Sequence, residues 1–166
     1  MRLERLSKVN LKQYRTVAHS CFPSQKDRGL IEALATEFLE LTREYYRKWC
    51  WYEEFLVLER GKPIGVTGVY KIHGKRAEFW LSWFGVKPPE RRKGLGMLIL
   101  QKTIGLAKSY GCTKFRIYSG PADKAAHALY RKAGFSVQRK PDTWLVVKGK
   151  KVWKYPKGTR FFYKRL

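Results

Sequence analysis

The feature that most constrains this chain is a strand, a turn and a helix in immediate succession over Phe84–Leu100. An apolar strand end is stopped by Pro88-Pro89, a basic turn with two glycines follows, and an apolar helix begins after it. Glycine permits positive φ and close backbone approach. The first turn of a helix has unpaired N–H groups and the positive end of the helix dipole. This combination predicts a site that holds phosphate.

The two commonest phosphate motifs do not describe this turn. A dinucleotide fingerprint would need a third glycine where the chain has Ile99, and a P-loop would need Gly-Lys followed by Ser or Thr. The spacing Arg91-x-x-Gly94-x-Gly96, five residues after the strand-terminal Val86, instead resembles the acyl-CoA pyrophosphate loop of the GNAT superfamily of N-acetyltransferases.

A second motif lies at the separation that this family shows. Its pattern, Asp-x-x-Ala-x-x-Leu-Tyr-x-x-x-Gly-Phe, is similar to the family's Asn-x-x-Ala-x-x-Leu-Tyr-x-x-x-Gly-Phe on the helix after the fifth strand. The matching residues are Asp123, Ala126, Leu129, Tyr130, Gly134 and Phe135. Asp123 is the departure, because Asn is common there; its carboxylate either lies near the acyl arm or only caps the helix. The resemblance covers about 54–140.

Apolar periodicity and turn residues predict the helices and strands. Helices are expected at 10–19, 27–49, 94–110 and 124–133. Strands are expected near the N-terminus and at 54–59, 64–72, 76–86, 114–118, 135–140 and 161–165, with a hairpin at 144–155. The resemblance implies an α+β fold, an α/β/α sandwich with helices on both faces of a twisted, mixed, mostly antiparallel sheet of six or seven strands. The two central parallel strands are expected to separate in a V-shaped splay.

Length and composition suit one globular domain over 1–166. The recognisable core is about 54–140, and 141–166 is a basic, aromatic C-terminal segment. The 44% apolar content excludes a disordered tail. No apolar run approaches the ~18 residues of a membrane span, and the N-terminus lacks the apolar segment of a signal peptide. Three widely spaced cysteines argue against zinc and disulfides. We therefore expect a reducing, cytoplasmic compartment and no metal.

The positive charge is concentrated in one part of the chain. The net charge is +23, but residues 1–60 carry 11 Lys/Arg against 9 Asp/Glu, whereas residues 61–166 carry 25 against 4. A cofactor with a few phosphates needs only a few cations. So large an excess favours a polyanionic partner, since phosphate contacts release counterions, although solubility is an alternative explanation. Residues 131–166 carry 12 Lys/Arg and one Asp, with aromatics between them.

The resemblance implies acetyl-CoA as the acyl donor and direct transfer to a primary amine in a ternary complex. Backbone N–H groups from Arg92 to Met97 would hold the diphosphate. Strands that splay after Val86 and Ser119 would leave backbone groups free for the pantetheine arm. The expected cofactor-binding residues are Phe84, Val86, Arg91, Arg92, Lys93, Gly94, Leu95, Gly96, Met97, Ser119, Asp123 and Ala126.

Two proton transfers need side chains. Tyr130 fits protonation of the leaving thiolate, since a phenol (pKa ~10) and a thiol (pKa ~8.5) are nearly matched; the alternative is that it only packs in the core. Many family members use a Glu as base on the third strand, where this chain has Trp80. Glu78 lies two residues away on the same face and is the expected base, with Glu53 and Glu54 as alternatives.

The acceptor is the least determined part of the prediction. Trp80 and Trp83 would shape an apolar acceptor slot, unless they pack against helices. His73 in a turn and His127 on a helix face directed to solvent are candidates in name only. The acceptor amine could be carried by a tRNA, a modified base or a ribosomal protein. The alternative function is a nucleic-acid-binding protein with a GNAT fold and weak or no catalysis. In either case the protein is expected to be a monomer or a homodimer.

Overall fold

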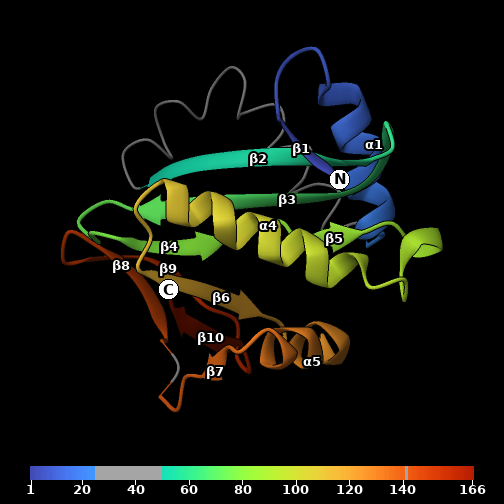
Figure 1. Ribbon diagram of the computed structural model, residues 1–166. Helices are drawn as coiled ribbons and strands as arrows, with labels where there is room; N and C mark the ends of the chain where they lie inside the picture. The colour runs from blue at the N-terminus through green and yellow to red at the C-terminus, as the bar shows by residue number, and fades with distance from the viewer. Residues whose placement is uncertain (25–49, 141) are drawn as a thin grey trace.

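The structure is a computed structural model that describes residues 1–24, 50–140 and 142–166 (Figure 1). The helix expected at 27–49 lies outside the described residues. The helices are α1 (Leu11–Cys21), α4 (Leu95–Ser109) and α5 (Lys124–Lys132), with a 3₁₀ turn, η1, at Pro88–Glu90. The strands are β1 (Arg2–Arg5), β2 (Cys50–Glu59), β3 (Lys62–Ile72), β4 (Glu78–Leu81), β5 (Gly85–Val86), β6 (Lys114–Ser119), β7 (Ser136–Val137), β8 (Trp144–Val147), β9 (Lys150–Lys154) and β10 (Arg160–Arg165).

One mixed sheet contains strands from both ends of the chain. Its order is β1-β2-β3-β4-β6-β10-β7, with β5 paired to β3, while β8 and β9 form a separate hairpin. The pair β4–β6 is parallel and the other pairs described in the sheet are antiparallel. The mixed sheet, the parallel central pair and the hairpin were predicted from the sequence and are confirmed. The hairpin turn was predicted at Lys148-Gly149-Lys150; in the structure it contains Lys148 and Gly149, and Lys150 begins β9.

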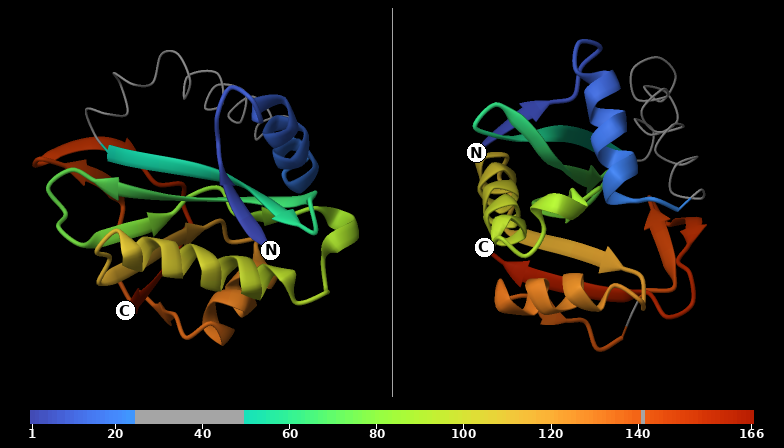
Figure 2. Two further views of the ribbon diagram at one scale, coloured as in Figure 1. Left: turned by 45° about the horizontal axis from the view of Figure 1, so that its top comes forward. Right: turned by 90° about the vertical axis from the view of Figure 1, so that its right-hand side faces the viewer.

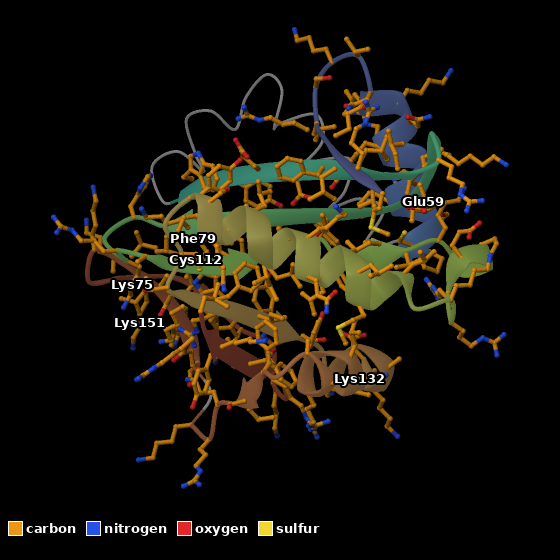
Figure 3. All side chains as sticks on the ribbon, viewed as in Figure 1. Glu59, Lys75, Phe79, Cys112, Lys132 and Lys151 are labelled. Atoms are coloured by element: carbon orange, nitrogen blue, oxygen red, sulfur yellow. The ribbon has the colours of Figure 1, made fainter. Side chains whose placement is uncertain are left out.

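The two faces of the sheet carry different elements, as the right-hand view of Figure 2 shows. Helices α4 and α5 cover one face, where Phe79, Leu100, Tyr130 and Phe162 share a core cluster. Helix α1 packs on the other face against alternate residues of β2 and β3. The hairpin β8–β9 covers the β4–β10 part of that second face, where its Val147 packs near Trp80. Figure 3 shows Phe79 beneath α4.

The central strands separate as expected. The parallel register joins β4 and β6 only from Glu78↔Lys114 to Trp80↔Arg116. Beyond it, β5 pairs with β3, whereas the end of β6 pairs with β10. Figure 1 shows β5 beside β3 and β6 beside β10, so the strands diverge.

The strand predicted at 76–86 is not continuous. Between the pairs Val69↔Leu81 and Val66↔Gly85, three steps on β3 face four steps on the other strand. The one extra residue is a β-bulge, which bends the strand and re-aims its side chains. The chain is therefore split into β4 and β5 at 82–84.

Other boundaries also differ from the prediction. The strand expected at 135–140 pairs only over Ser136–Val137, because β10 enters the sheet between β6 and β7. Asp123 stands at the N-cap position of α5 but makes no capping hydrogen bond. No helix in the described part of the chain is long and apolar enough to cross a membrane.

Candidate active site

The glycine turn lies between η1 and α4 and has two residues in left-handed conformation, Arg92 (φ 62°) and Gly94 (φ 78°). A Cβ built at Gly94 would meet nothing within 4 Å, so the space above the turn is open. The Met97 N–H donates to the Gly94 carbonyl at 3.1 Å. Over the described residues, the backbone N–H groups from Arg92 to Gly96 donate no hydrogen bond within the protein. They form an anion-binding concavity of the kind that a helix start provides.

The charged side chains around this turn divide into two groups. The Arg91 guanidinium donates to the carbonyls of Val86 (2.9 Å) and Cys21 (3.1 Å), so it ties the turn to β5 and to the end of α1. Lys93 pairs with Glu90 at 2.8 Å, and this pair lowers the pKa of the Glu90 carboxyl. Arg92 is exposed. The turn is therefore held rigidly at Arg91 and remains positive.

The β6–α5 turn faces the same opening. The Ser119 hydroxyl donates to the Asp123 carboxylate at 2.7 Å, and the Gly120 N–H donates to the same oxygen at 3.0 Å. Asp123 therefore orders the turn, a third role beside the two that the sequence left open. Ala126 packs against the core cluster under α4. A Cβ on Gly96 would lie 3.5 Å from Leu129, so the start of α4 adjoins α5.

Tyr130 extends from α5 into the core between the two helices. It is buried, and its ring lies 5.3 Å from Phe162 and 6.3 Å from Phe84 between centroids. Burial, with a smaller contribution from Asp123, raises the pKa of the phenol well above its ordinary value, so it keeps its proton. Its hydroxyl has no hydrogen-bond partner within the described residues. It adjoins Phe84, at the point where the strands separate, as a proton donor to a leaving thiolate would.

The bulge sets the directions of three consecutive residues. Phe84 packs with the α4 face, whereas Trp83 packs with α1 and meets Phe22 edge to face at 4.9 Å. Ser82 also faces the α1 side, where its hydroxyl bonds Tyr52.

Trp80 is fully buried, stacked on Tyr70 and covered by the Arg116 guanidinium at 4.1 Å. Trp83 thus lies nearer the opening than Trp80.

Glu78, the expected base, lies in an ionic network. Its carboxylate pairs with Lys114 at 2.9 Å and with Arg116 at 3.4 Å. Arg116 also pairs with Asp142 at 2.6 Å. The role of Glu78 as base stays a prediction.

The two alternative carboxylates point to opposite faces. Glu53 faces α4, where it accepts from Tyr110 at 2.7 Å and pairs with Arg5 at 2.6 Å. Glu54 faces α1 and is 3% exposed. Tyr14 donates to its Oε2 at 3.0 Å. Burial raises the pKa of the Glu54 carboxyl to about 7, against the lowering effect of hydrogen bonds from Ser82, Tyr52, Tyr14 and the Trp83 N–H.

The sequence offered Glu54 only as an alternative base, and the strand pairing shows what distinguishes its position. It stands opposite Gly68 in the β2–β3 register, and a Cβ at Gly68 would lie only 2.3 Å from Glu54 Oε1. The carboxylate therefore occupies space that a glycine leaves. A charged residue facing a glycine inside an apolar strand pair marks a special position.

The prediction that His127 faces solvent is wrong. Its side chain is 2% exposed and packs on Phe162, at 5.3 Å between centroids. Burial, then the neighbouring Arg160, lowers the pKa of the imidazole, so it stays neutral. His127 stands three residues before Tyr130, and residues at that spacing share a helix face.

A groove of about 390 Å³ lies between α4 and the end of α5. Met97, Gln101 and Ile104 line one side, and Lys132, Ala133 and Lys164 line the other. It extends the opening at the glycine turn along α4. Across the described ranges, no group of His, Cys, Asp and Glu could hold a metal ion.

Comparisons with known proteins agree with this geometry. The Acetyltransferase (GNAT) family profile matches residues 19–135. A putative GNAT acetyltransferase structure from Desulfovibrio desulfuricans is 15% identical, with 99% of this chain and 98% of that chain covered and a TM-score of 0.74. The paia N-acetyltransferase of Thermoplasma acidophilum, in complex with coenzyme A, is 17% identical, with 100% of both chains covered and a TM-score of 0.69. A ribosomal-protein-alanine N-acetyltransferase from Brucella melitensis is 15% identical, with 100% of both covered and a TM-score of 0.64. At such identities these structures show the fold alone. No curated protein sequence matches the chain.

Proposed function

The chain belongs to the acetyltransferase (GNAT) family, and on this premise we propose that it transfers an acetyl group from acetyl-CoA to a primary amine by direct transfer. The observation that carries the proposal is the turn from Arg92 to Gly96, with its free N–H groups beside the opening between β5 and β6. Two solved structures of the same fold have coenzyme A or acetyl-CoA bound. The described residues fit acetyl-CoA, because the turn is positively charged, has unpaired backbone N–H groups and has open space above it.

The donor supplies the thioester, and the chain supplies position and protons. The N–H groups from Arg92 to Gly96 bind the diphosphate. The backbone of Phe84 and Val86 lines the opening for the pantetheine arm. At Phe84 the bulge leaves an N–H that makes no hydrogen bond within the described part of the chain. Such fixed dipoles stabilise developing negative charge, by ~2.7–4 kcal/mol per donor in enzymes where this was measured. Tyr130 holds the proton that the leaving thiolate takes.

We propose further that the acceptor amine is carried on, or associated with, a nucleic acid. Each of the four carboxylates in residues 61–166 is already bonded: Glu78 and Asp142 to cations, Glu90 to Lys93, and Asp123 to its own turn. The cations of the hairpin and its surroundings therefore have few acidic partners. Lys151 and Lys154 lie over the Trp144 ring, at 5.6 and 5.8 Å. Cations beside an aromatic ring suit phosphate contact and base stacking.

These cations lie on the same face of the sheet as α1, opposite α4 and α5. The hairpin packs on Ile72 and Trp80. Figure 3 shows Lys151 and Lys75 toward the same end of the molecule in that view, and Lys132 near α5. An acceptor that approaches between α1 and the hairpin would pass this basic surface. We propose the cytoplasm as the compartment, where such partners occur; Cys21 and Cys112 are both free thiols.

The proposed activity is tested by measuring the release of free CoA thiol from acetyl-CoA. The acceptor panel holds polyamines, N-terminal alanyl peptides, deacylated and aminoacylated tRNA, and purified ribosomal proteins. Thiol release that depends on an amine acceptor supports the enzyme. No release with any acceptor, together with tight binding of tRNA, would instead support the alternative of a nucleic-acid-binding protein that shares this fold.

The nucleic-acid part has its own test. The triple variant Lys150→Gln, Lys151→Gln, Lys154→Gln removes three exposed hairpin cations. Its matched control, Lys62→Gln, Lys102→Gln, Lys108→Gln, removes three exposed cations elsewhere. The hairpin variant should lower the slope of log affinity against log salt for tRNA by about 2–3, and the control should not. Equal slopes in both variants and the wild type would remove the hairpin from the interface.

A further inference from the structure

We propose that Glu54 is the group that takes the proton from the acceptor ammonium, with the Ser82 hydroxyl linking it to the opening of the sheet. This inference rests on the proposed function, because it names the proton acceptor of that reaction. The sequence prediction placed this role first at Glu78 and named Glu54 as one of two alternatives.

The first step of the argument is the state of the carboxylate. Glu54 lies on β2, is 3% exposed and has no cation bonded to it among the described residues. Its Oε1 is buried and has no hydrogen bond that satisfies normal geometry. Leaving a buried charge without a cation is costly. Such costs are expected where function requires the group.

The second step is the shape of the site. Gly68 faces Glu54 across the β2–β3 ladder, and any larger residue would collide with the carboxylate. Tyr14 reaches the carboxylate from α1 and fixes its Oε2 by the 3.0 Å hydrogen bond. The strand pair and α1 therefore hold one rotamer of Glu54 in place. Because β2, β3 and α1 all shape this position, the buried carboxylate is a built feature of the site and not a packing defect.

The third step is the position relative to the opening. Ser82 and Trp83 follow β4 directly, where the β4–β6 pairing has ended. The Ser82 N–H donates to the Gly68 carbonyl at 2.9 Å, so the bulge is anchored above Glu54. The Ser82 hydroxyl hydrogen-bonds with the Tyr52 hydroxyl, and the Ser82 hydroxyl and the Trp83 N–H both act to lower the pKa of the Glu54 carboxyl against the effect of burial. The next residue is Phe84, whose backbone lines the opening proposed for the thioester.

In the part of the chain that the structure describes, the titratable groups around Glu54 are few. Tyr14 and Tyr52 face it, and burial raises the pKa of both phenols well above 10, so they remain protonated. Cys21 neighbours Tyr14, and burial raises the pKa of its thiol to about 11. Arg91 and Lys87, on either side of η1, act on Cys21 and lower the pKa of its thiol against the effect of burial. Glu54 is therefore the group in this cluster that changes charge near neutral pH, where a base works best.

The other two carboxylates that the sequence suggested, Glu78 and Glu53, lack this combination. Glu78 is bonded to two cations, Lys114 and Arg116, whereas Glu54 has no cation bonded to it among the described residues. Glu53 is on the opposite face, bonded to Tyr110 and Arg5. Neither lies beside the bulge.

The proposed step balances. The acceptor ammonium gives one proton through Ser82 to the Glu54 carboxylate, and the freed nitrogen lone pair bonds to the thioester carbonyl carbon. The C–S bond breaks, and Tyr130 gives a proton to the leaving thiolate. The second nitrogen proton replaces the one lost by Tyr130. The proton on Glu54 returns to water, so the products are an amide, a thiol and one proton.

The first measurement uses the wild-type protein and needs no variant. The pH dependence of kcat/KM is recorded with two active primary amines from the acceptor panel whose amine pKa values differ by about two units. We expect kcat/KM to fall on the acidic side of the profile with a midpoint near pH 7, and this acidic limb should be the same for both amines because it reports a group of the enzyme. A limb that moves with the pKa of the amine, with no fixed limb near pH 7, would overturn the proposal.

The variants then identify the residue. Glu54→Gln should lower kcat/KM at pH 7 by about 10²–10⁴-fold and remove the fixed limb, while the Kd for CoA stays the same. Tyr14→Phe removes a hydrogen bond that favours the charged carboxylate, so the limb should move to higher pH. Glu78→Gln is the matched control and should keep the limb. Loss of the limb in Glu78→Gln, or its retention in Glu54→Gln, would overturn the assignment to Glu54.

A thermal melt separates this role from a structural one. A residue that only supports the fold would lower the melting temperature when neutralised. Glu54→Gln should instead melt at a higher temperature than the wild type at pH 8, because it removes a buried charge. If Glu54→Gln does not fold, the wild-type profile and Tyr14→Phe still decide. If the wild type acetylates no amine in the panel, the proposed function itself fails, which differs from an active wild type whose limb is unaffected by Glu54→Gln.

Discussion

Gly94→Asp tests the phosphate site, and Gly111→Asp is a matched control. Both glycines are exposed and have left-handed backbones, with φ of 78° at Gly94 and 81° at Gly111. A Cβ meets nothing within 4 Å at either position. Each substitution should therefore cost about the same backbone strain, roughly 1–2 kcal/mol, and each adds one negative charge. A similar fall in melting temperature of about 2–8 °C is expected for both variants.

The two variants should differ only in their affinity for CoA. A carboxylate at Gly94 would stand beside the diphosphate bound by residues 92–96. Two like charges about 4 Å apart cost about 1 kcal/mol in water. Repulsion from the two charges of a diphosphate thus comes to about 2 kcal/mol, or about a 30-fold higher Kd. Side-chain crowding would add to this value.

The assay is isothermal titration calorimetry of CoA against the two variants and the wild type, with thermal melts in the same buffer. Gly94→Asp should bind CoA at least about 30-fold more weakly than Gly111→Asp. Equal affinities in the two variants would mean that the diphosphate does not lie on this turn, and the reasoning from its free N–H groups would be refuted.

Three further predictions concern Tyr130, Glu54 and the core. Tyr130→Phe keeps the ring packing and removes only the hydroxyl, so kcat should fall by about 10²-fold with an unchanged Kd for CoA; an unchanged kcat in steady-state assays would exclude the phenol from proton transfer. The pKa of Glu54 rises from 4.5 to about 7 on folding, so the folded state binds more protons than the unfolded state in that range. The free energy of unfolding should therefore fall as pH rises from about 4.5 to 7, by up to about 3 kcal/mol. A denaturation series in which the free energy of unfolding of Glu54→Gln depends on pH as steeply as that of the wild type would contradict this. Phe162 on β10 is fully buried against α5, so Phe162→Ala should lower the free energy of unfolding by about 3–5 kcal/mol, and a loss below 1 kcal/mol in urea would show that this core is misplaced.

The strand–turn–helix unit could be predicted because its signals are local. Proline stops the strand, Gly94 supplies the positive φ, and apolar periodicity marks α4. The hairpin turn at Lys148-Gly149 and the helix end near Gly111 are local in the same way. These residues act through their own backbone, so a single sequence reveals them.

The features that the sequence did not reveal depend on distant partners. The bulge at 82–84 exists because β3 pairs with β4 and β5 in two registers, and the apolar residues on either side read as one strand. The burial of His127 depends on Phe162, which arrives from the last strand. Glu54 acquires its environment from Tyr14, Gly68 and Ser82, each on a different segment. The composition of the chain and the spacing of its residues do not reveal these long-range contacts.

The central claim is tested most directly by a crystal structure of the protein with coenzyme A. The account predicts diphosphate oxygens within hydrogen-bonding distance, about 2.7–3.2 Å, of the backbone nitrogens between Arg92 and Gly96. It also predicts the sulfur in the opening between β5 and β6, next to the Tyr130 hydroxyl. A diphosphate bound elsewhere, or a sulfur far from Tyr130, would contradict it.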